Sequence, residues 1–234
     1  MYATAGLSLL GLVLTLLFYR EAPINRADDN APLRFTLPLR QFIHMGVVAI
    51  AWTFFNGALI LVVSFSPDAL VENGFESADA RTAVSLLLWA TLFSLPLGGR
   101  LTEMLGRITL SVVVCYLISA GAILAITQGL APELSFVCLG IFFGIPGGAL
   151  MALSAEAVSA DNRGPGLGIF YTWYFAGMTL TPALAGWLRD TTGSAQAPLY
   201  LAMVMTIGVV VLVGLLRLLQ RTWPIGIIVD NARN

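Results

Sequence analysis

The sequence predicts an all-α polytopic membrane protein with about seven transmembrane helices, and three observations carry this prediction. Of the 234 residues, 58% are hydrophobic and only 11% are charged, whereas soluble domains are about one quarter charged. The chain also contains seven long apolar runs separated by short polar segments. Finally, it has no lysine, and its arginines gather in alternate loops.

Each apolar run is close to the length that spans a bilayer, about 18 residues or more without charge. The third run is the shortest. In chain order the predicted spans are Tyr2–Tyr19, Phe42–Phe65, Thr82–Leu97, Ile108–Gln128, Leu134–Leu153, Gly166–Leu188 and Leu199–Leu216.

The arginines predict the orientation of these spans, because basic residues concentrate in cytoplasmic loops. Only Arg81 and Arg189 fall on the other side of the predicted topology. This asymmetry places the C-terminus in the cytoplasm and the N-terminus outside. It also excludes a nucleic-acid partner, because no single basic face forms.

The first run begins within two residues of Met1 and has no positively charged leader. Arg20 and Glu21 stand where a signal peptide would carry small residues. We therefore predict a transmembrane helix over residues 1–19, followed by a proline-containing cytoplasmic linker over 20–41.

A short, charged, glycine-rich turn, Gly98–Arg107, joins the third and fourth spans, and so predicts that these spans are antiparallel neighbours. Its spacing resembles the signature loop of the major facilitator superfamily, roughly G-x-L-x-D-R-x-G-R. Gly99, Leu101, Gly106 and Arg107 match this pattern. Glu103 replaces the usual Asp, and Met104 replaces a basic residue.

A second stretch, Ser154–Gly193, is similar to the tenth-to-eleventh helix region of the same family. Glu156 precedes Arg163, which opens the next span, and Gly177 and Pro182 lie within that span. Glycines let membrane helices approach closely.

The resemblance implies a secondary active transporter of a small solute. Residues 42–220 would be its C-terminal half, with six helices in two inverted three-helix repeats and with 221–234 as a cytoplasmic tail. Residues 1–19 would be the last helix of a missing N-terminal half, present in cis or in trans. The alternative is a natural short protein. The connection Ser66–Arg81 is similar to that of cyanate-permease-like bacterial members, which implies the inner membrane of a bacterium.

Catalytic and metal-binding patterns are absent from the sequence. His44 is the sole histidine, predicted at the membrane interface, and Cys115 and Cys138 lie in apolar runs without metal-ligand spacing. No acidic residue falls near the middle of a span. Gly144–Gly148 predicts a helix discontinuity or a close crossing. We expect no enzyme activity, cofactor or metal.

Polar and aromatic side chains at membrane depth are the candidate solute contacts. Asn56 needs a hydrogen-bond partner in hydrocarbon, and Trp52 lies one turn before it. Tyr171, Tyr174 and Met178 share a face of the sixth span. The resemblance places these residues near a central cavity; the alternative is packing between helices.

Charged residues at the predicted cytoplasmic helix ends are candidates for a conformational latch. Glu103 and Glu156 are predicted beside Arg100, Arg107 and Arg163, where ion pairs can form in one state and break in another. The alternative is a role in topology and solubility.

A seven-helix receptor matches the predicted topology as well. The absence of lysine excludes a retinal Schiff base, and no Asp/Glu-Arg-Tyr triplet follows the third span. A membrane enzyme is the other alternative, although no loop carries a catalytic set.

Overall fold

The computed structural model describes residues 2–18 and 37–224 and divides the chain into two units, Met1–Arg34 and Phe35–Asn234. The first unit contains helix α1 (Tyr2–Phe18), whose described side chains are exposed and almost all apolar. Most of the predicted linker, residue Tyr19 and the last ten residues of the predicted tail lie outside the described residues.

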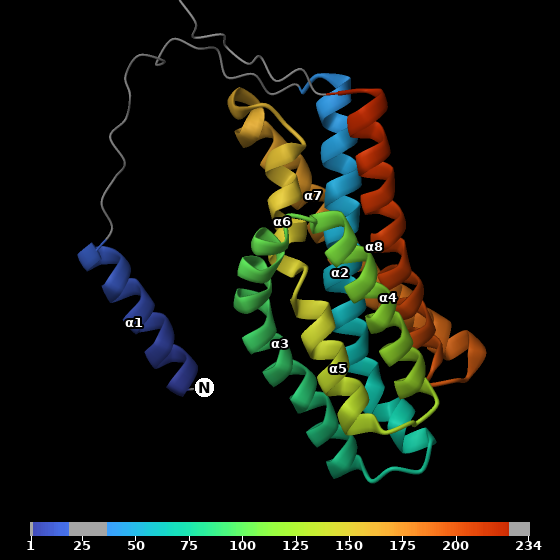
Figure 1. Ribbon diagram of the computed structural model, residues 1–234. Helices are drawn as coiled ribbons and strands as arrows, with labels where there is room; N and C mark the ends of the chain where they lie inside the picture. The colour runs from blue at the N-terminus through green and yellow to red at the C-terminus, as the bar shows by residue number, and fades with distance from the viewer. Residues whose placement is uncertain (1, 19–36, 225–234) are drawn as a thin grey trace, which may run out of the picture. The chain divides into compact units, whose positions relative to one another are not determined.

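The second unit is all-helical over its described residues (Figure 1). Its elements are α2 (Leu39–Glu72), α3 (Ser77–Leu105), α4 (Ile108–Thr127), α5 (Pro132–Gly144), α6 (Gly147–Glu156), the 3-10 turn η2 (Ala160–Asn162), α7 (Arg163–Thr192) and α8 (Ala197–Thr222). The all-α prediction is therefore confirmed.

Five helical segments of the described chain are long and apolar enough to cross a membrane. They are Leu39–Glu72, Ser77–Leu101, Ile108–Thr127, Pro132–Glu156 and Ala197–Thr222. Helix α1 is too short to meet this criterion. Helix α7 is 30 residues long but less apolar, because tyrosine, tryptophan and threonine replace aliphatic side chains along it.

The helices at the second and third predicted spans are longer at both ends than the predicted spans. Helix α2 begins at Leu39 and continues through Pro67 to Glu72, and α3 already begins at Ser77. The long connection predicted over Ser66–Arg81 is therefore mostly helical. Pro67 lies within α2, where its missing N–H removes one backbone hydrogen bond, and the helix continues on both sides of it.

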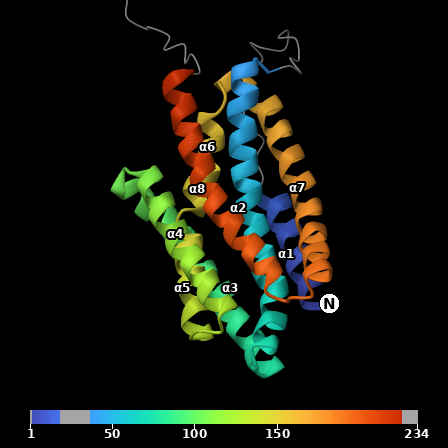
Figure 2. The same ribbon diagram turned by 90° about the vertical axis from the view of Figure 1, so that its right-hand side faces the viewer.

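Helix α2 is the centre of the second unit, and packs most extensively on α8 and α7, whereas α3 packs chiefly on α5 (Figures 1 and 2). Helix α4 contacts α8 and α5. The α2–α7 and α3–α5 pairs have the same place in the fold, because each joins the first helix of one predicted repeat to the second helix of the other. An inverted repeat requires this correspondence.

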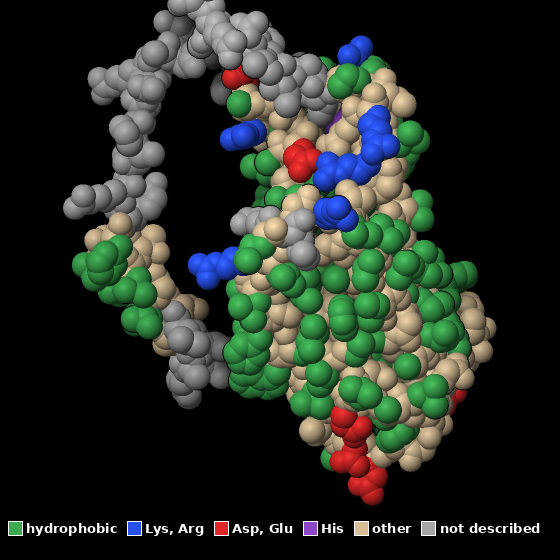
Figure 3. All heavy atoms as spheres, viewed as in Figure 1, with side chains coloured by type: hydrophobic (Ala, Val, Ile, Leu, Met, Phe, Trp, Pro, Cys, Tyr) green, Lys and Arg blue, Asp and Glu red, His purple; other side chains and the backbone are tan. Residues whose placement is uncertain are grey.

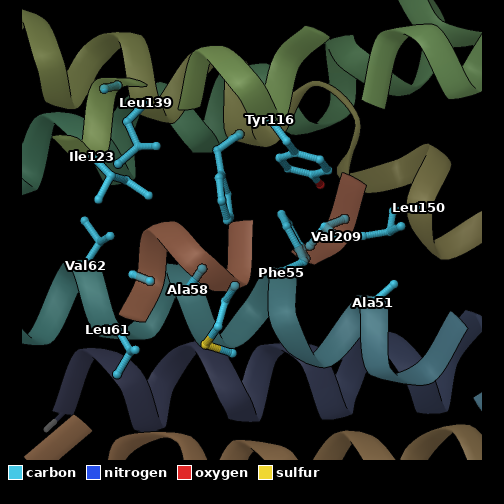
Figure 4. Close-up of a cluster of buried hydrophobic side chains, with 14 of the residues drawn as sticks. Ala51, Phe55, Ala58, Leu61, Val62, Tyr116, Ile123, Leu139, Leu150 and Val209 are labelled. Atoms are coloured by element: carbon cyan, nitrogen blue, oxygen red, sulfur yellow. The ribbon is translucent and has the colours of Figure 1, made fainter. Parts of the chain in front are cut away.

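Aromatic rings from three helices form the middle of the core (Figure 4). Phe55 of α2 stacks on Phe143 of α5 with centroids 4.9 Å apart, and Tyr116 of α4 meets Phe143 edge-on at 5.5 Å. All three side chains are buried. The Tyr116 hydroxyl has no hydrogen-bond partner in the described structure.

The predicted discontinuity at Gly144–Gly148 is confirmed, and a close crossing accompanies it. Helix α5 ends at Gly144 and α6 begins at Gly147, with Pro146 between them. A Cβ at Gly144 would collide with the Ser94 side chain of α3. The Ser94 hydroxyl donates a hydrogen bond to the Gly140 carbonyl at 2.8 Å, so the crossing joins helices directly through a backbone acceptor.

The two ends of the second unit differ in charge (Figure 3). We call the end where α2 begins and α8 ends the arginine-rich end; it carries Arg40, Arg100, Arg107, Arg163, Arg217 and Arg221. We call the opposite end the acidic end; it carries Asp68, Glu72, Glu76, Asp79, Glu133 and Asp190.

Candidate functional site

Helices α2 and α7 run parallel from the arginine-rich end to the acidic end, in a constant register. A Cβ at Gly177 would meet Thr53, and a Cβ at Gly57 would meet Thr181. At the acidic end, Arg189 donates to Asp68 at 2.6 Å. The two helices therefore stay side by side from the middle of the unit to its acidic end.

An aromatic series connects the predicted solute contacts of these two helices. Trp52 of α2 lies 6.2 Å from Phe170 of α7, and Phe170 meets Tyr171 at 5.3 Å. Tyr171 in turn meets Tyr174 at 6.5 Å. The structure thus brings Trp52, Tyr171 and Tyr174 into one aromatic series. Phe170, which links Trp52 to the tyrosines, is not among the residues that the sequence predicts. Neither tyrosine hydroxyl has a partner among the described residues.

Asn56 is half-buried on the same side of α2 as Trp52, one helical turn away. Its Nδ2 donates to the Trp52 carbonyl at 2.9 Å. This bond stays within α2, so in this structure the amide does not join two helices. Its Oδ1 has no partner in the described part of the chain and can accept a hydrogen bond from a solute.

Two threonine hydroxyls of α7 already donate hydrogen bonds within their own helix. Thr172 and Thr179 donate to the carbonyls of Gly168 and Phe175 in their own helix. Met178 is half-buried and lies one helical turn after Tyr174, on the same face of α7. The two tyrosine hydroxyls and the Asn56 amide oxygen therefore keep free hydrogen-bonding capacity on this face.

A pocket of about 720 Å³ lies away from this face, between α3 and α5. Trp89, Phe93, Leu97 and Ile141 are among its lining residues, and its charged residue is Arg100. Because the lining is almost entirely apolar, this pocket suits an apolar helix or lipid chain better than a polar solute.

The predicted latch residues are arranged differently from the prediction. Glu156 forms its ion pair with Arg217 of α8 at 2.6 Å, not with Arg163. Arg217 also donates to Thr109 of α4 at 3.0 Å. The pair therefore joins α6, α8 and α4 within the six-helix unit, which the sequence had not indicated. The side chain of Glu103 lies outside the described residues.

The predicted turn over Gly98–Arg107 is mostly wrong, because α3 continues to Leu105 and the chain turns only at Gly106 and Arg107. Gly106 has a φ of 60°, which favours glycine, and links the end of α3 to α4. Gly99 has open space where a Cβ would lie, whereas a Cβ at its neighbour Gly98 would collide with the Ile145 backbone. Leu101 is exposed. Within the motif, the close approach thus belongs to Gly98 rather than to Gly99.

His44, which we predict at the membrane interface, is fully buried within the protein near the start of α2. Its Nδ1 donates to the Arg40 carbonyl at 2.7 Å. Nearby on α2, Gln41 bonds to Ser159 and Asn162, which bring the α6–α7 connection over the start of α2. No group of three potential metal ligands occurs among the described residues.

The family model for the Major Facilitator Superfamily matches residues 47–227, which is most of the chain. The chain belongs to the major facilitator superfamily. Members of this superfamily are transporters rather than enzymes, which agrees with the apolar helices and bears against the receptor alternative. The protein is an integral membrane protein.

Among curated proteins, the chain is similar to monocarboxylate transporter 12 of Xenopus laevis. The two are 31% identical over 120 residues, which are 46% of this chain and 25% of the relative. The aligned part thus spans about a quarter of the relative's length.

Proposed function

We propose that residues 39–222 act as the C-terminal half of a major facilitator transporter that moves a small solute by alternating access. The aromatic and amide face of α2 and α7 carries this proposal. It presents two tyrosine hydroxyls and the Asn56 carbonyl at membrane depth, all without partners in the described structure. Unpartnered polar groups in hydrocarbon are costly, so a bound polar solute would satisfy them.

A small monocarboxylate is the solute class that we favour. Tyrosine hydroxyls donate hydrogen bonds to carboxylate oxygens, and no acidic side chain on this face would repel an anion. The name of the similar relative supports the same class. Cyanate, which the weaker sequence resemblance implies, is also a small monoanion and is the competing solute.

The second half of the transporter would be supplied in cis or in trans and would face α2 and α7 across the solute path. The exposed aromatic side chains of α7, among them Tyr171, Trp173 and Phe175, support this arrangement. We further propose that the arginine-rich end faces the cytoplasm, as basic loops do, and that the membrane is a bacterial inner membrane.

Solute binding and uptake test the two parts of this proposal separately. We expect lactate to change the tryptophan fluorescence of the reconstituted protein, because Trp52 belongs to the proposed face, and cyanate to bind more weakly. Stronger binding of cyanate would overturn the monocarboxylate assignment. Saturable uptake by a chain shown to be monomeric in the vesicle would contradict its role as one half.

Two variants test the face itself. Asn56→Ala and Tyr174→Phe should each weaken lactate binding about fivefold, the loss of one hydrogen bond worth about 1 kcal/mol. Tyr116→Phe is the matched control, because it removes a tyrosine hydroxyl from the buried core. Unchanged affinity in both test variants, with a stability loss of about 0.6 kcal/mol, would assign these side chains to packing.

A further inference from the structure

A second concave site lies at the arginine-rich end, between the start of α4 and the end of α8. It has a volume of about 360 Å³ and is lined by Gly106, Arg107, Ile108, Thr109, Leu110 and Arg217. None of these residues belongs to the proposed solute face, which α2 and α7 form. The site therefore requires a separate explanation.

The charge of this site is predominantly positive. Arg107 makes no ion pair within the described residues. Arg217 donates hydrogen bonds from Nε to Thr109 and from Nη1 to Glu156 and Gln220. Its Nη2 has no described partner. Arg221 follows one helical turn later. Among the described residues of this site, the acid that pairs with an arginine is Glu156, through Arg217.

Exposed apolar side chains occur on both helices, between the site and the middle of the predicted spans. Leu110 and Val114 are exposed on α4, and Val211 and Leu215 are exposed on α8. The bond between Arg217 and Thr109 aligns the two helices at the same level. Polar donors thus lie at the helix ends, next to surfaces suited to acyl chains.

We propose that this site binds the phosphate group of an anionic phospholipid, with the acyl chains against α4 and α8. Arginine binds phosphate through paired N–H groups, and basic pockets between membrane helices bind anionic headgroups. A soluble phosphate would gain only the polar part of the site, whereas a lipid also contacts the apolar surfaces. This proposal is independent of the solute.

Native mass spectrometry of the purified chain with added phosphatidylglycerol measures this binding, with phosphatidylcholine as the neutral comparison. We expect phosphatidylglycerol to bind more tightly. Arg107→Gln should weaken its binding about fivefold, which corresponds to about 1 kcal/mol for one arginine. Arg81→Gln, which removes an exposed arginine near the acidic end, should leave it unchanged. Equal losses in the two variants, or equal binding of both lipids, would overturn the proposal.

A second variant predicts a change in the opposite direction. Glu156→Gln removes the negative charge beside Arg217, so phosphatidylglycerol should bind more tightly than to the unaltered protein. A purely structural role for the ion pair predicts no such gain, and weaker binding would contradict the proposal. Millimolar inorganic phosphate should compete poorly; complete displacement of the lipid would assign the site to a soluble anion.

Discussion

The α3–α5 and α2–α7 crossings have the same place in the two predicted repeats, yet glycine acts differently in each. At α3–α5, a Cβ at Gly98 would collide with the backbone of Ile145, the residue after α5, and one at Gly140 would lie 2.6 Å from both the Leu87 carbonyl and the Ala90 side chain. At α2–α7, a Cβ at Gly177 would meet the Thr53 side chain. Backbone atoms therefore limit the approach of α3 and α5 at Gly98 and Gly140, whereas at Gly177 a side chain separates α2 from α7.

This difference determines how each crossing can respond to a change. A backbone contact can be relieved only by moving a helix, whereas a side-chain contact can be relieved by a rotation or a second substitution. The α3–α5 pair should therefore behave as one rigid body, and α2–α7 should tolerate adjustment beside the proposed solute face.

Gly98→Ala should have the largest effect on the free energy of unfolding. We expect a loss of about 3 kcal/mol, at the upper end of the usual cost of overpacking, because the new methyl group meets backbone atoms. Denaturation in mixed detergent micelles measures it. Gly99→Ala is the neighbouring control, with open space at its Cβ, and should be neutral or slightly stabilising. Equal losses in the two variants would remove the distinction between the crossings.

Gly177→Ala should cost about 1–2 kcal/mol, because its new Cβ would meet the Thr53 methyl group at 2.1 Å. Adding Thr53→Ser removes that methyl group and keeps the hydroxyl that donates to Ala49. The double variant should recover most of the lost stability in the same assay. Additive losses would show that the α2–α7 backbones, and not the side chain, limit the approach.

Gly57→Ala should change stability by less than about 1 kcal/mol. The nearest atom is the flexible Met205 methyl group at 2.5 Å, followed by Thr181 at 3.2 Å. Methionine adapts readily to new neighbours, and alanine favours a helix over glycine by about 1 kcal/mol. A loss as large as that of Gly98→Ala would mean that α2 is as constrained as α3.

Single polar contacts should contribute least at both crossings. Ser94→Ala removes the hydrogen bond to Gly140 and should cost about 0.6 kcal/mol, independent of salt. Asp68→Asn breaks the exposed pair with Arg189 and should cost about 0.5 kcal/mol, less at high ionic strength. Thermal unfolding at two salt concentrations separates the two contributions, and a salt-dependent Ser94→Ala would contradict this assignment.

The sequence predicted those features that local chemistry determines. Apolar runs located the helices, Gly106 marked the turn into α4, and the Gly144–Gly148 stretch marked the break between α5 and α6. Partners between helices were not predictable in this way. Gly98 and Gly99 are adjacent residues of the same type. Only the register of α3 against the neighbouring helices leaves no room for a Cβ at Gly98 and open space for one at Gly99.

The same limit applies to the candidate sites. Spacing on one helix grouped Tyr171 with Tyr174 and Trp52 with Asn56, but Phe170, which connects the two groups, gave no signal of its own. Glu156 was expected beside Arg163, its neighbour along the chain, and instead pairs with Arg217. Charge pairs depend on which helix ends meet in space, and local patterns along the chain do not show this.

The 34 residues of α2 make it about 51 Å long at 1.5 Å per residue, whereas the hydrocarbon core of a bilayer is about 30 Å thick. Such a helix must tilt or protrude, and α7, which is held in register beside it, must follow. The broken α5–α6 span can instead bend at its break. Bilayer thickness should therefore change the angle between the α2–α7 pair and the α3–α5 pair. Distances between spin labels on α2 and α5, measured in short-chain and in long-chain lipids, would detect this change.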